Sequence, residues 1–288
     1  MRLELTSDAE SFAALAADFL AATPERNLLA TVLNDVLTRS SSGGEPLFAC
    51  GLDERDEPVA VALRTPPWPL LAHGFDCAED ARALLAEWLA LDPRPGAVGA
   101  EPATARTLAG AWEDLAGGTS QLLRKEAMHA LDAVRAPARP APGRLRVASP
   151  AERPLLIAWE EAFGEEANVA SRPQAARNID ARMAAGRLFV WDDGGAVSYL
   201  ARSGPVAGVT RIGPVYTPPE QRRRGYATSA VASLAQRSLD EGSSRCMLFT
   251  DLANPTSNRI YAAIGFVRFG DWEDIALRPR AAAAAPRP

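Results

Sequence analysis

Cysteine, histidine and lysine are all scarce in this sequence of 288 residues. The three cysteines lie far apart, no Cys-x-x-Cys pair occurs, and the two histidines stand alone. We therefore expect neither a disulfide framework nor a metal site. Lys125 is the only lysine among the 31 basic residues, so we attribute the many arginines to composition bias rather than to function.

Long apolar runs are missing too. No run of about 18 or more apolar residues occurs, and the start, Met-Arg-Leu-Glu-Leu, lacks the apolar core of a signal peptide. The net charge of −5 gives no basic field that would attract nucleic acid or anionic lipid. We expect a cytoplasmic protein with neither nucleic acid nor a membrane as its partner.

A Pro/Ala connector divides the sequence. Residues 136–142 read Ala-Pro-Ala-Arg-Pro-Ala-Pro, a composition typical of an extended, semi-rigid segment. It separates a first domain, residues 1–135, from a second, residues 143–278. Residues 279–288 are rich in Ala, Pro and Arg, and we expect them to be a disordered tail.

The two halves repeat one order of predicted elements. A strand, a charged turn and a second strand begin at Leu47 and again at Leu188, an offset of 188 − 47 = 141 residues. Each half then continues with a helix, a short apolar strand and another helix. The shared order predicts a tandem duplication. The elements after the strand pair are 79–89, 97–100 and 103–115 in the first half, and 226–239, 246–250 and 255–264 in the second.

A turn rich in arginine distinguishes the second half. Residues 212–215 form a short strand, in which the pair Gly213-Pro214 predicts a bulge or splay. Residues 222–227, Arg-Arg-Arg-Gly-Tyr-Ala, then open a helix. Small residues at a helix start let backbone N–H groups approach a phosphate closely. A solvated arginine cluster is the alternative interpretation of the arginines, but it leaves the complete strand–turn–helix unit unexplained.

The matching stretch of the first half, residues 68–79, has no such turn. Acidic Asp76 lies where an anion would approach, so we expect no anion site there. Other phosphate loops do not fit the sequence either. A Walker loop needs a lysine that the second half lacks, and no Gly-x-Gly-x-x-Gly occurs.

A second short pattern follows at residues 254–266. Asn254-Pro255 is typical of a helix N-cap and first turn, and Asn258 and Tyr261 share one face of that helix. An unperturbed phenol has a pKa near 10, close enough to that of a thiol to protonate a departing thiolate. Packing of Tyr261 in the core, and capping or surface polarity of the two asparagines, are the alternatives.

These residues together resemble the GCN5-related N-acetyltransferase (GNAT) family. Its motif A, [Gln/Arg]-x-x-Gly-x-[Gly/Ala], matches residues 222–227, and its motif B resembles residues 254–266, with Tyr261 and Gly265-Phe266 in place. The resemblance implies an α/β (α+β) fold of two GNAT-like domains, each a mixed, mostly antiparallel sheet flanked by helices. The first domain would be degenerate, without the acetyl-CoA motif.

The resemblance also implies a reaction. Acetyl-CoA would be the co-substrate at a single site in the second half, and its acetyl group would move by direct attack to the primary amine of a small molecule or peptide. Tyr261 would be the general acid, and the Val215 N–H a donor to the oxyanion. The cofactor-binding residues would be Val215, Tyr216, Thr217, Arg222, Arg223, Arg224, Gly225, Tyr226, Ala227, Thr228, Asn254 and Asn258.

The general base is unknown. The strand that often carries it in this family offers Thr210 and Arg211 but no carboxylate. The candidates elsewhere are Glu160, Glu161, Glu165 and Asp251, each of which is better explained as a solvated surface charge than as a base. A non-catalytic acyl-CoA sensor or interaction module with the same fold is therefore the alternative function, and a homodimer is left open.

Overall fold

The computed structural model describes residues 1–38, 44–167 and 172–279. Residues 280–288, most of the predicted tail, lie outside the described residues. The chain divides into two compact units. Unit 1 comprises residues 1–127, 251–253 and the chain from Gly270 on, and unit 2 comprises residues 128–250 and 254–269. No helix in the described ranges is long and apolar enough to cross a membrane.

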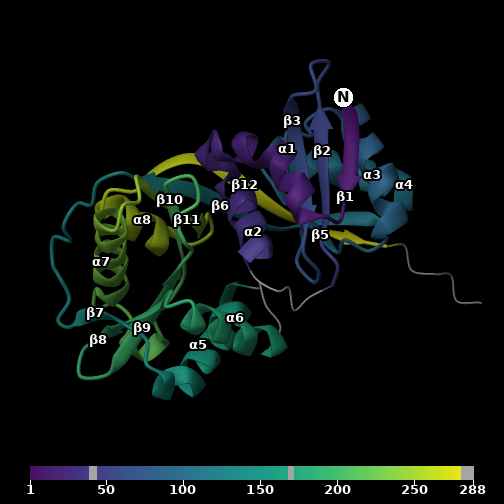
Figure 1. Ribbon diagram of the computed structural model, residues 1–288. Helices are drawn as coiled ribbons and strands as arrows, with labels where there is room; N and C mark the ends of the chain where they lie inside the picture. The colour runs from purple at the N-terminus through teal and green to yellow at the C-terminus, as the bar shows by residue number, and fades with distance from the viewer. Residues whose placement is uncertain (39–43, 168–171, 280–288) are drawn as a thin grey trace, which may run out of the picture. The chain divides into compact units, whose positions relative to one another are not determined.

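Unit 1 contains the predicted helices and strands in the order that the repeat predicts (Figure 1). Its last strand, β6, continues into unit 2. The elements are β1 (Arg2–Thr6), α1 (Ala9–Ala21), η1 (Pro24–Arg26), α2 (Asn27–Thr38), β2 (Leu47–Leu52), β3 (Pro58–Arg64), β4 (Leu70–His73), α3 (Ala78–Leu91), β5 (Ala97–Ala100), α4 (Pro102–Ala116) and β6 (Thr119–Leu131).

Unit 2 repeats this order of strands and α-helices. The predicted elements of the repeat are all present, with ends displaced by at most two residues. The elements are β7 (Arg144–Val147), η2 (Pro150–Glu152), α5 (Arg153–Ala167), α6 (Arg172–Ala184), β8 (Leu188–Asp192), β9 (Ala196–Arg202), β10 (Val209–Tyr216), η3 (Pro219–Gln221), α7 (Tyr226–Asp240), β11 (Arg245–Asp251), α8 (Pro255–Ala263) and β12 (Val267–Arg278).

Both sheets are mixed and mostly antiparallel, which confirms the predicted fold class. The strand order is β1-β2-β3-β4-β5-β12-β6 in unit 1 and β6-β11-β10-β9-β8-β7 in unit 2. The parallel pairs are β4 with β5 and β10 with β11. The antiparallel pairs include β1 with β2, β2 with β3, β3 with β4, β5 with β12, and successive strands from β7 to β10.

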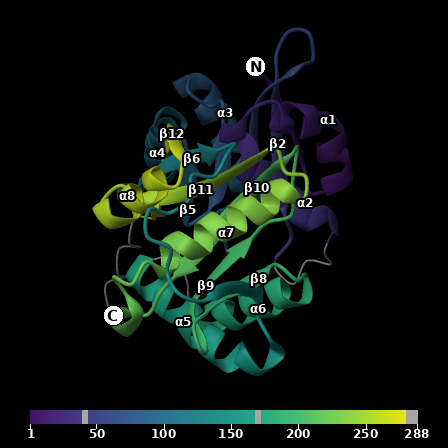
Figure 2. The ribbon, with the colours of Figure 1, turned by 90° about the vertical axis from the view of Figure 1, so that its left-hand side faces the viewer.

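Helices cover both faces of the sheet in unit 2 (Figures 1 and 2). Phe189 and Trp191 of β8 belong to one hydrophobic cluster with the inner face of α7. Leu188 and Val190, their neighbours along the strand, belong to another with α5 and α6. This alternation follows from the period of two in a strand, because successive side chains point to opposite faces. Both faces of β8 are therefore buried.

Two strands cross between the compact units at points other than the predicted domain limits, which are residue 135 for the first domain and residues 143–278 for the second. The end of β6, from Met128 on, belongs to unit 2, and the end of β12, from Gly270 on, belongs to unit 1. Glu273 and Asp274 of β12 pair with Ala100 and Gly99 of β5. Each sheet therefore includes a segment from the other half of the sequence.

The Pro/Ala connector packs within unit 2. The backbone N–H of Ala141 donates to Oγ of Ser229 on α7 at 2.8 Å, and Nε1 of Trp191 donates to the Pro142 carbonyl at 2.7 Å. The backbone N–H of Arg135 donates to the Ile264 carbonyl at 2.9 Å. Two hydrogen bonds thus hold the end of the connector, and a third holds the residue before it.

Candidate functional site

Strands β10 and β11 separate in the middle of the sheet of unit 2. They pair in parallel at three positions, from Val209 opposite Arg245 to Arg211 opposite Met247. Both strands continue beyond that point, to Tyr216 and Asp251, without further pairing to each other in the described register. A splayed pair of strands leaves backbone groups along the gap that a ligand can bind.

The predicted bulge marks the start of this splay. The register of β10 against β9 shifts between Ile212 and Val215, the position of Gly213-Pro214. Pairing resumes with Val215 opposite Leu200 and Tyr216 opposite Tyr199. The buried hydroxyl of Ser198 donates to the Tyr216 carbonyl at 2.8 Å. The end of β10 is therefore held by a side chain as well as by its neighbour strand.

The turn between β10 and α7 has the backbone of an anion-binding loop. Arg223 has a φ of +64° and Gly225, the N-cap of α7, has a φ of +80°. Left-handed residues within a turn converge backbone N–H groups into a concavity, and the first N–H groups of a helix point the same way. A 15-residue helix starts at this concavity with no side-chain cap. The geometry suits a phosphate.

The arginines of the turn are placed differently from one another. Arg223 and Arg224 are exposed. Arg222 is held by its neighbours, because its Nε donates to the Thr217 carbonyl at 2.9 Å and its Nη2 donates to both carboxylate oxygens of Glu166 at 2.7 and 2.8 Å. It also lies 5.7 Å from the centroid of the Tyr216 ring.

The first turn of α7 contains the remaining residues of motif A. Tyr226 is buried, and its hydroxyl donates to Oδ2 of Asp193 at 2.6 Å, which raises the pKa of the phenol. Ala227 and Thr228 are half-buried. Tyr226 therefore anchors the helix start to the β8–β9 turn, and its hydroxyl is not directed at the concavity.

The asparagines of motif B lie where the sequence predicts. Asn254 is the N-cap of α8, and its side chain accepts from the Ser257 N–H at 3.2 Å. Asn258 accepts a hydrogen bond from the Thr250 hydroxyl at the end of β11 and donates to the Asn254 carbonyl at 3.0 Å. Asn258 thus ties α8 to the strand that forms one side of the splay.

Tyr261 is a buried residue of α8. It is 8% exposed and packs edge-on against Phe266, with ring centroids 6.0 Å apart. Burial raises the pKa of its phenol to about 12. The group is therefore protonated at neutral pH, as a general acid must be, but it is a weaker acid than the sequence alone indicates. Full proton transfer to a thiolate of pKa about 8.5 is uphill by roughly 5 kcal/mol.

The candidate bases differ sharply in their surroundings. Glu160 is buried, and its carboxylate accepts from Tyr199 at 2.5 Å, Arg182 at 2.8 Å and Asn178 at 3.0 Å. Burial, followed by the charge of Glu160, raises the pKa of Tyr199 well above its ordinary value. The three donors and the low exposure make Glu160 a structural group rather than a base. Glu161 is half-buried, and Glu165 and Asp251 are exposed.

The corresponding turn of unit 1 is short and acidic. Only residues 74–77 separate β4 from α3, and Oδ1 of Asp76 accepts from the Thr104 hydroxyl at 2.5 Å. At the ends of β4 and β5, Nδ1 of His73 lies 2.7 Å from Oε1 of Glu101. A turn whose carboxylate is held by a side chain of α4 does not suit an anion. This supports the expectation that the first half holds no acetyl-CoA.

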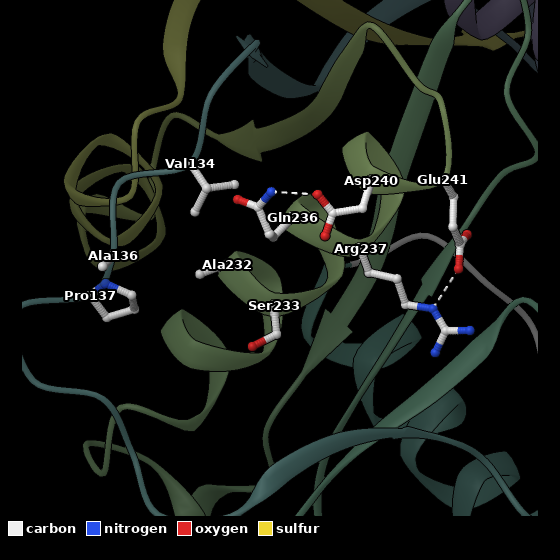
Figure 3. Close-up of a pocket in the computed structure, with 9 residues that line it drawn as sticks. All are labelled: Val134, Ala136, Pro137, Ala232, Ser233, Gln236, Arg237, Asp240 and Glu241. Atoms are coloured by element: carbon white, nitrogen blue, oxygen red, sulfur yellow. Dashed lines mark hydrogen bonds and ion pairs between the residues drawn. The ribbon is translucent and has the colours of Figure 1, made fainter.

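An open groove of about 650 Å³ lies elsewhere in unit 2, between the connector and the outer face of α7 (Figure 3). Its polar groups pair with one another, Gln236 with Asp240 and Arg237 with Glu241. None of the predicted site residues lines it. The lining residues are Val134, Ala136, Pro137, Ala232, Ser233, Gln236, Arg237, Asp240 and Glu241.

Sequence reasoning missed two residues that the structure adds to the site. Ser198 lies opposite the end of β10. His129 lies near the C-terminal end of strand β6 and contacts Thr250. Neither lies in a motif. Strand β6 is 13 residues long, which is longer than most strands. Such a length indicates that the strand extends from one unit into the other. No group of side chains that could hold a metal ion occurs in the described part of the chain.

The class that the fold defines is an α/β protein with a mixed sheet, in which a splayed parallel pair of strands is followed by a turn and an uncapped helix start. Residues 153–266 match the model of the Acetyltransferase (GNAT) family. The chain thus carries a domain of the GNAT family. Comparison with curated proteins gave no match.

Solved structures share the fold over nearly the whole chain. A GCN5-related N-acetyltransferase from Sphaerobacter thermophilus is 18% identical with a TM-score of 0.60, covering 96% of each chain. A tandem GNAT protein from the clavulanic acid biosynthesis pathway, solved without acetyl-CoA, is 16% identical with a TM-score of 0.61, covering 98% of this chain and all of the other. A GNAT acetyltransferase from Colwellia psychrerythraea is 10% identical with a TM-score of 0.59, covering 97% and 100%.

Proposed function

We propose that the protein is an acetyl-CoA-dependent N-acetyltransferase with one cofactor site, in unit 2. The observation that carries the proposal is the concavity at residues 223–225, which opens at the N-terminus of α7 beside the splay of β10 and β11. Its N–H groups would bind the pyrophosphate, and the edge of β10 from Val215 to Thr217 would bind the pantetheine arm.

The acyl transfer needs few groups from the protein. The amine nitrogen attacks the thioester carbonyl carbon, the C–S bond breaks, and the amine loses a proton as the sulfur leaves. We assign the Val215 N–H to the developing oxyanion and Tyr261 to the sulfur. Because the pKa of Tyr261 is raised to about 12, its part is to donate a hydrogen bond to the thiolate and to complete the transfer only as the sulfur departs.

No carboxylate lies on β10, and Glu160 is held by three donors. We therefore propose that the acceptor amine loses its proton to water. The acceptor class is the primary amine of a small molecule or a peptide.

Acetyl-CoA binding and turnover test the proposal. We expect acetyl-CoA to raise the melting temperature, and a panel of primary amines to include at least one that releases CoA. No shift with acetyl-CoA or with longer acyl-CoAs contradicts the cofactor assignment.

A non-catalytic acyl-CoA sensor is the alternative function, favoured by the missing base. Tyr261→Phe separates the two. An enzyme should lose turnover by about tenfold or more while its affinity for acetyl-CoA stays within about twofold, since the phenol acts on the leaving sulfur. Tyr199→Phe is the matched control, because Tyr199 is also buried but its hydroxyl donates to Glu160 and it is not among the predicted site residues. A sensor would bind acetyl-CoA and show no turnover in any of these proteins.

A further inference from the structure

A buried chain of hydrogen bonds connects β6, β11 and α8 in unit 2. Nε2 of His129 lies 3.1 Å from Oγ1 of Thr250, and the Thr250 hydroxyl donates to Oδ1 of Asn258. His129 is 6% exposed and Thr250 is 3% exposed. The chain therefore runs from the interior of the sheet to a residue that we assign to the cofactor.

The direction of each hydrogen bond follows from the donors available. The amide nitrogen of Asn258 donates to the Asn254 carbonyl, which orients its oxygen toward Thr250. A threonine hydroxyl has a single proton, and Thr250 gives it to Asn258, so Thr250 must accept from His129. His129 therefore carries its proton on Nε2. Its N–H group orients the Thr250 hydroxyl, and that hydroxyl in turn orients the Asn258 amide.

We infer that His129 is a positioning residue for the acetyl-CoA site, acting through Thr250 on Asn258. The inference rests on the proposed function. The Asn258 amide accepts from Thr250 at one end and donates to Asn254 at the other, so it links the end of β11 to the start of α8, the helix that also carries Tyr261. His129 holds that helix against the end of β11 without contact with the cofactor itself.

This assignment extends the site beyond the part of the chain that resembles the GNAT family. His129 lies before the connector and outside the matched residues 153–266, yet within unit 2. It also precedes the limit of 135 that the sequence predicts for the first domain. The site of unit 2 is thus completed by a strand whose first residues belong to unit 1.

Substitutions along the chain of hydrogen bonds test the inference on the full-length protein, with acetyl-CoA as the probe. His129→Leu and Thr250→Val each remove a link and should raise the Kd and KM for acetyl-CoA about five- to tenfold, the change that corresponds to one lost hydrogen bond. Either change should leave kcat within about threefold. The double variant should be no worse than the worse single variant, because both break the same chain.

Conservative variants and a matched histidine complete the design. His129→Gln and Thr250→Ser keep a donor in place and should restore the affinity to within about twofold of the original. His73→Leu removes the other histidine, in unit 1, and should leave the Kd unchanged. If His129→Leu does not fold, the Kd values of Thr250→Val and Thr250→Ser for acetyl-CoA are sufficient to test the inference.

The outcomes are distinct. A lower melting temperature with an unchanged Kd in His129→Leu and Thr250→Val would show that the chain only stabilises the fold, and would overturn the inference alone. Failure of the wild-type protein to bind acetyl-CoA would overturn the proposed function and this inference with it. A Kd that rises in both variants and is restored in both conservative variants supports the inference.

Discussion

Arg222, in the turn before α7, and Glu166, at the end of α5, form an ion pair in which one guanidinium nitrogen donates to both carboxylate oxygens, at 2.7 and 2.8 Å. The two side chains are 41% and 49% exposed, so solvent screens the pair, and its contribution to stability is about 0.2–1 kcal/mol. A phosphate at the turn would compete with Glu166 for the same guanidinium. If the proposed site binds a phosphate, we expect the pair to lower its affinity.

Glu166→Gln should increase the affinity for acetyl-CoA about two- to fivefold, because it removes the competing charge and leaves the turn intact. Isothermal titration measures the change, and raising the salt concentration should diminish it. Glu165→Gln, an adjacent exposed carboxylate, serves as the control and should have a smaller effect. Weaker binding by the Glu166 variant would mean that the pair orders the turn instead of competing with the ligand.

Gly225→Ala should weaken acetyl-CoA binding by about tenfold or more and lower the free energy of unfolding by about 1–2 kcal/mol, because a φ of +80° is unfavourable for any residue with a Cβ. Gly117 provides the control. It has a φ of +63° at the end of α4 in unit 1, and a Cβ there would meet no atom within 4 Å. Gly117→Ala should cost similar stability and leave acetyl-CoA binding unchanged. Equal binding losses in both variants would count against the turn as the anion site.

Glu160→Gln should reduce the free energy of unfolding by about 3 kcal/mol, because it leaves Arg182 beside a neutral group at a buried position. Glu161→Gln, on the same helix and half-buried, should change it by less than about 0.5 kcal/mol. Chemical denaturation measures both. The kcat of the folded Glu160 variant should be unchanged, and a hundredfold loss of kcat with little loss of stability would identify Glu160 as the general base after all.

The four tyrosines should titrate late in the folded protein. Burial is the main cause of the raised pKa of Tyr199, Tyr216 and Tyr261, and the hydrogen bond to Asp193 is the main cause for Tyr226. A group whose folded pKa is raised binds its proton more tightly when folded. The resulting stability is fully present below the unfolded pKa of about 10 and is lost as the pH rises through the folded values.

Phenolate absorbance should therefore show little change near pH 10 in the folded protein and a full step there in denaturant. Tyr261→Phe should remove one phenol from the step near pH 12. A complete phenolate step near pH 10 before the protein unfolds would contradict the burial of these side chains.

The local backbone of the candidate site could be predicted because it depends on contiguous residues. Gly213-Pro214 predicted the shift of register on β10, and residues 222–227 predicted the turn that opens α7. Asn254 predicted the N-cap of α8. Each of these features could be predicted because it follows from the backbone preference of one or two residues, and those residues can be identified in the sequence.

The surroundings of the site could not be predicted in the same way. The buried position of Glu160 depends on Arg182 and Tyr199, 22 and 39 residues away, and no local pattern connects them. Likewise, the alternation of side chains along β6 and β12 shows that each is a strand but does not show which sheet receives each end. The predicted limits at 135 and 278 therefore differ from the compact units.

The exchange of strand ends sets an order of assembly during synthesis. The sheet of unit 1 needs residues 270–278 between β5 and β6, and Glu273, 2% exposed in that segment, accepts from Arg106 of α4 at 2.6 and 2.8 Å. These residues leave the ribosome after all of unit 2. The sheet of unit 1 therefore cannot be completed until residues 270–278 have been translated.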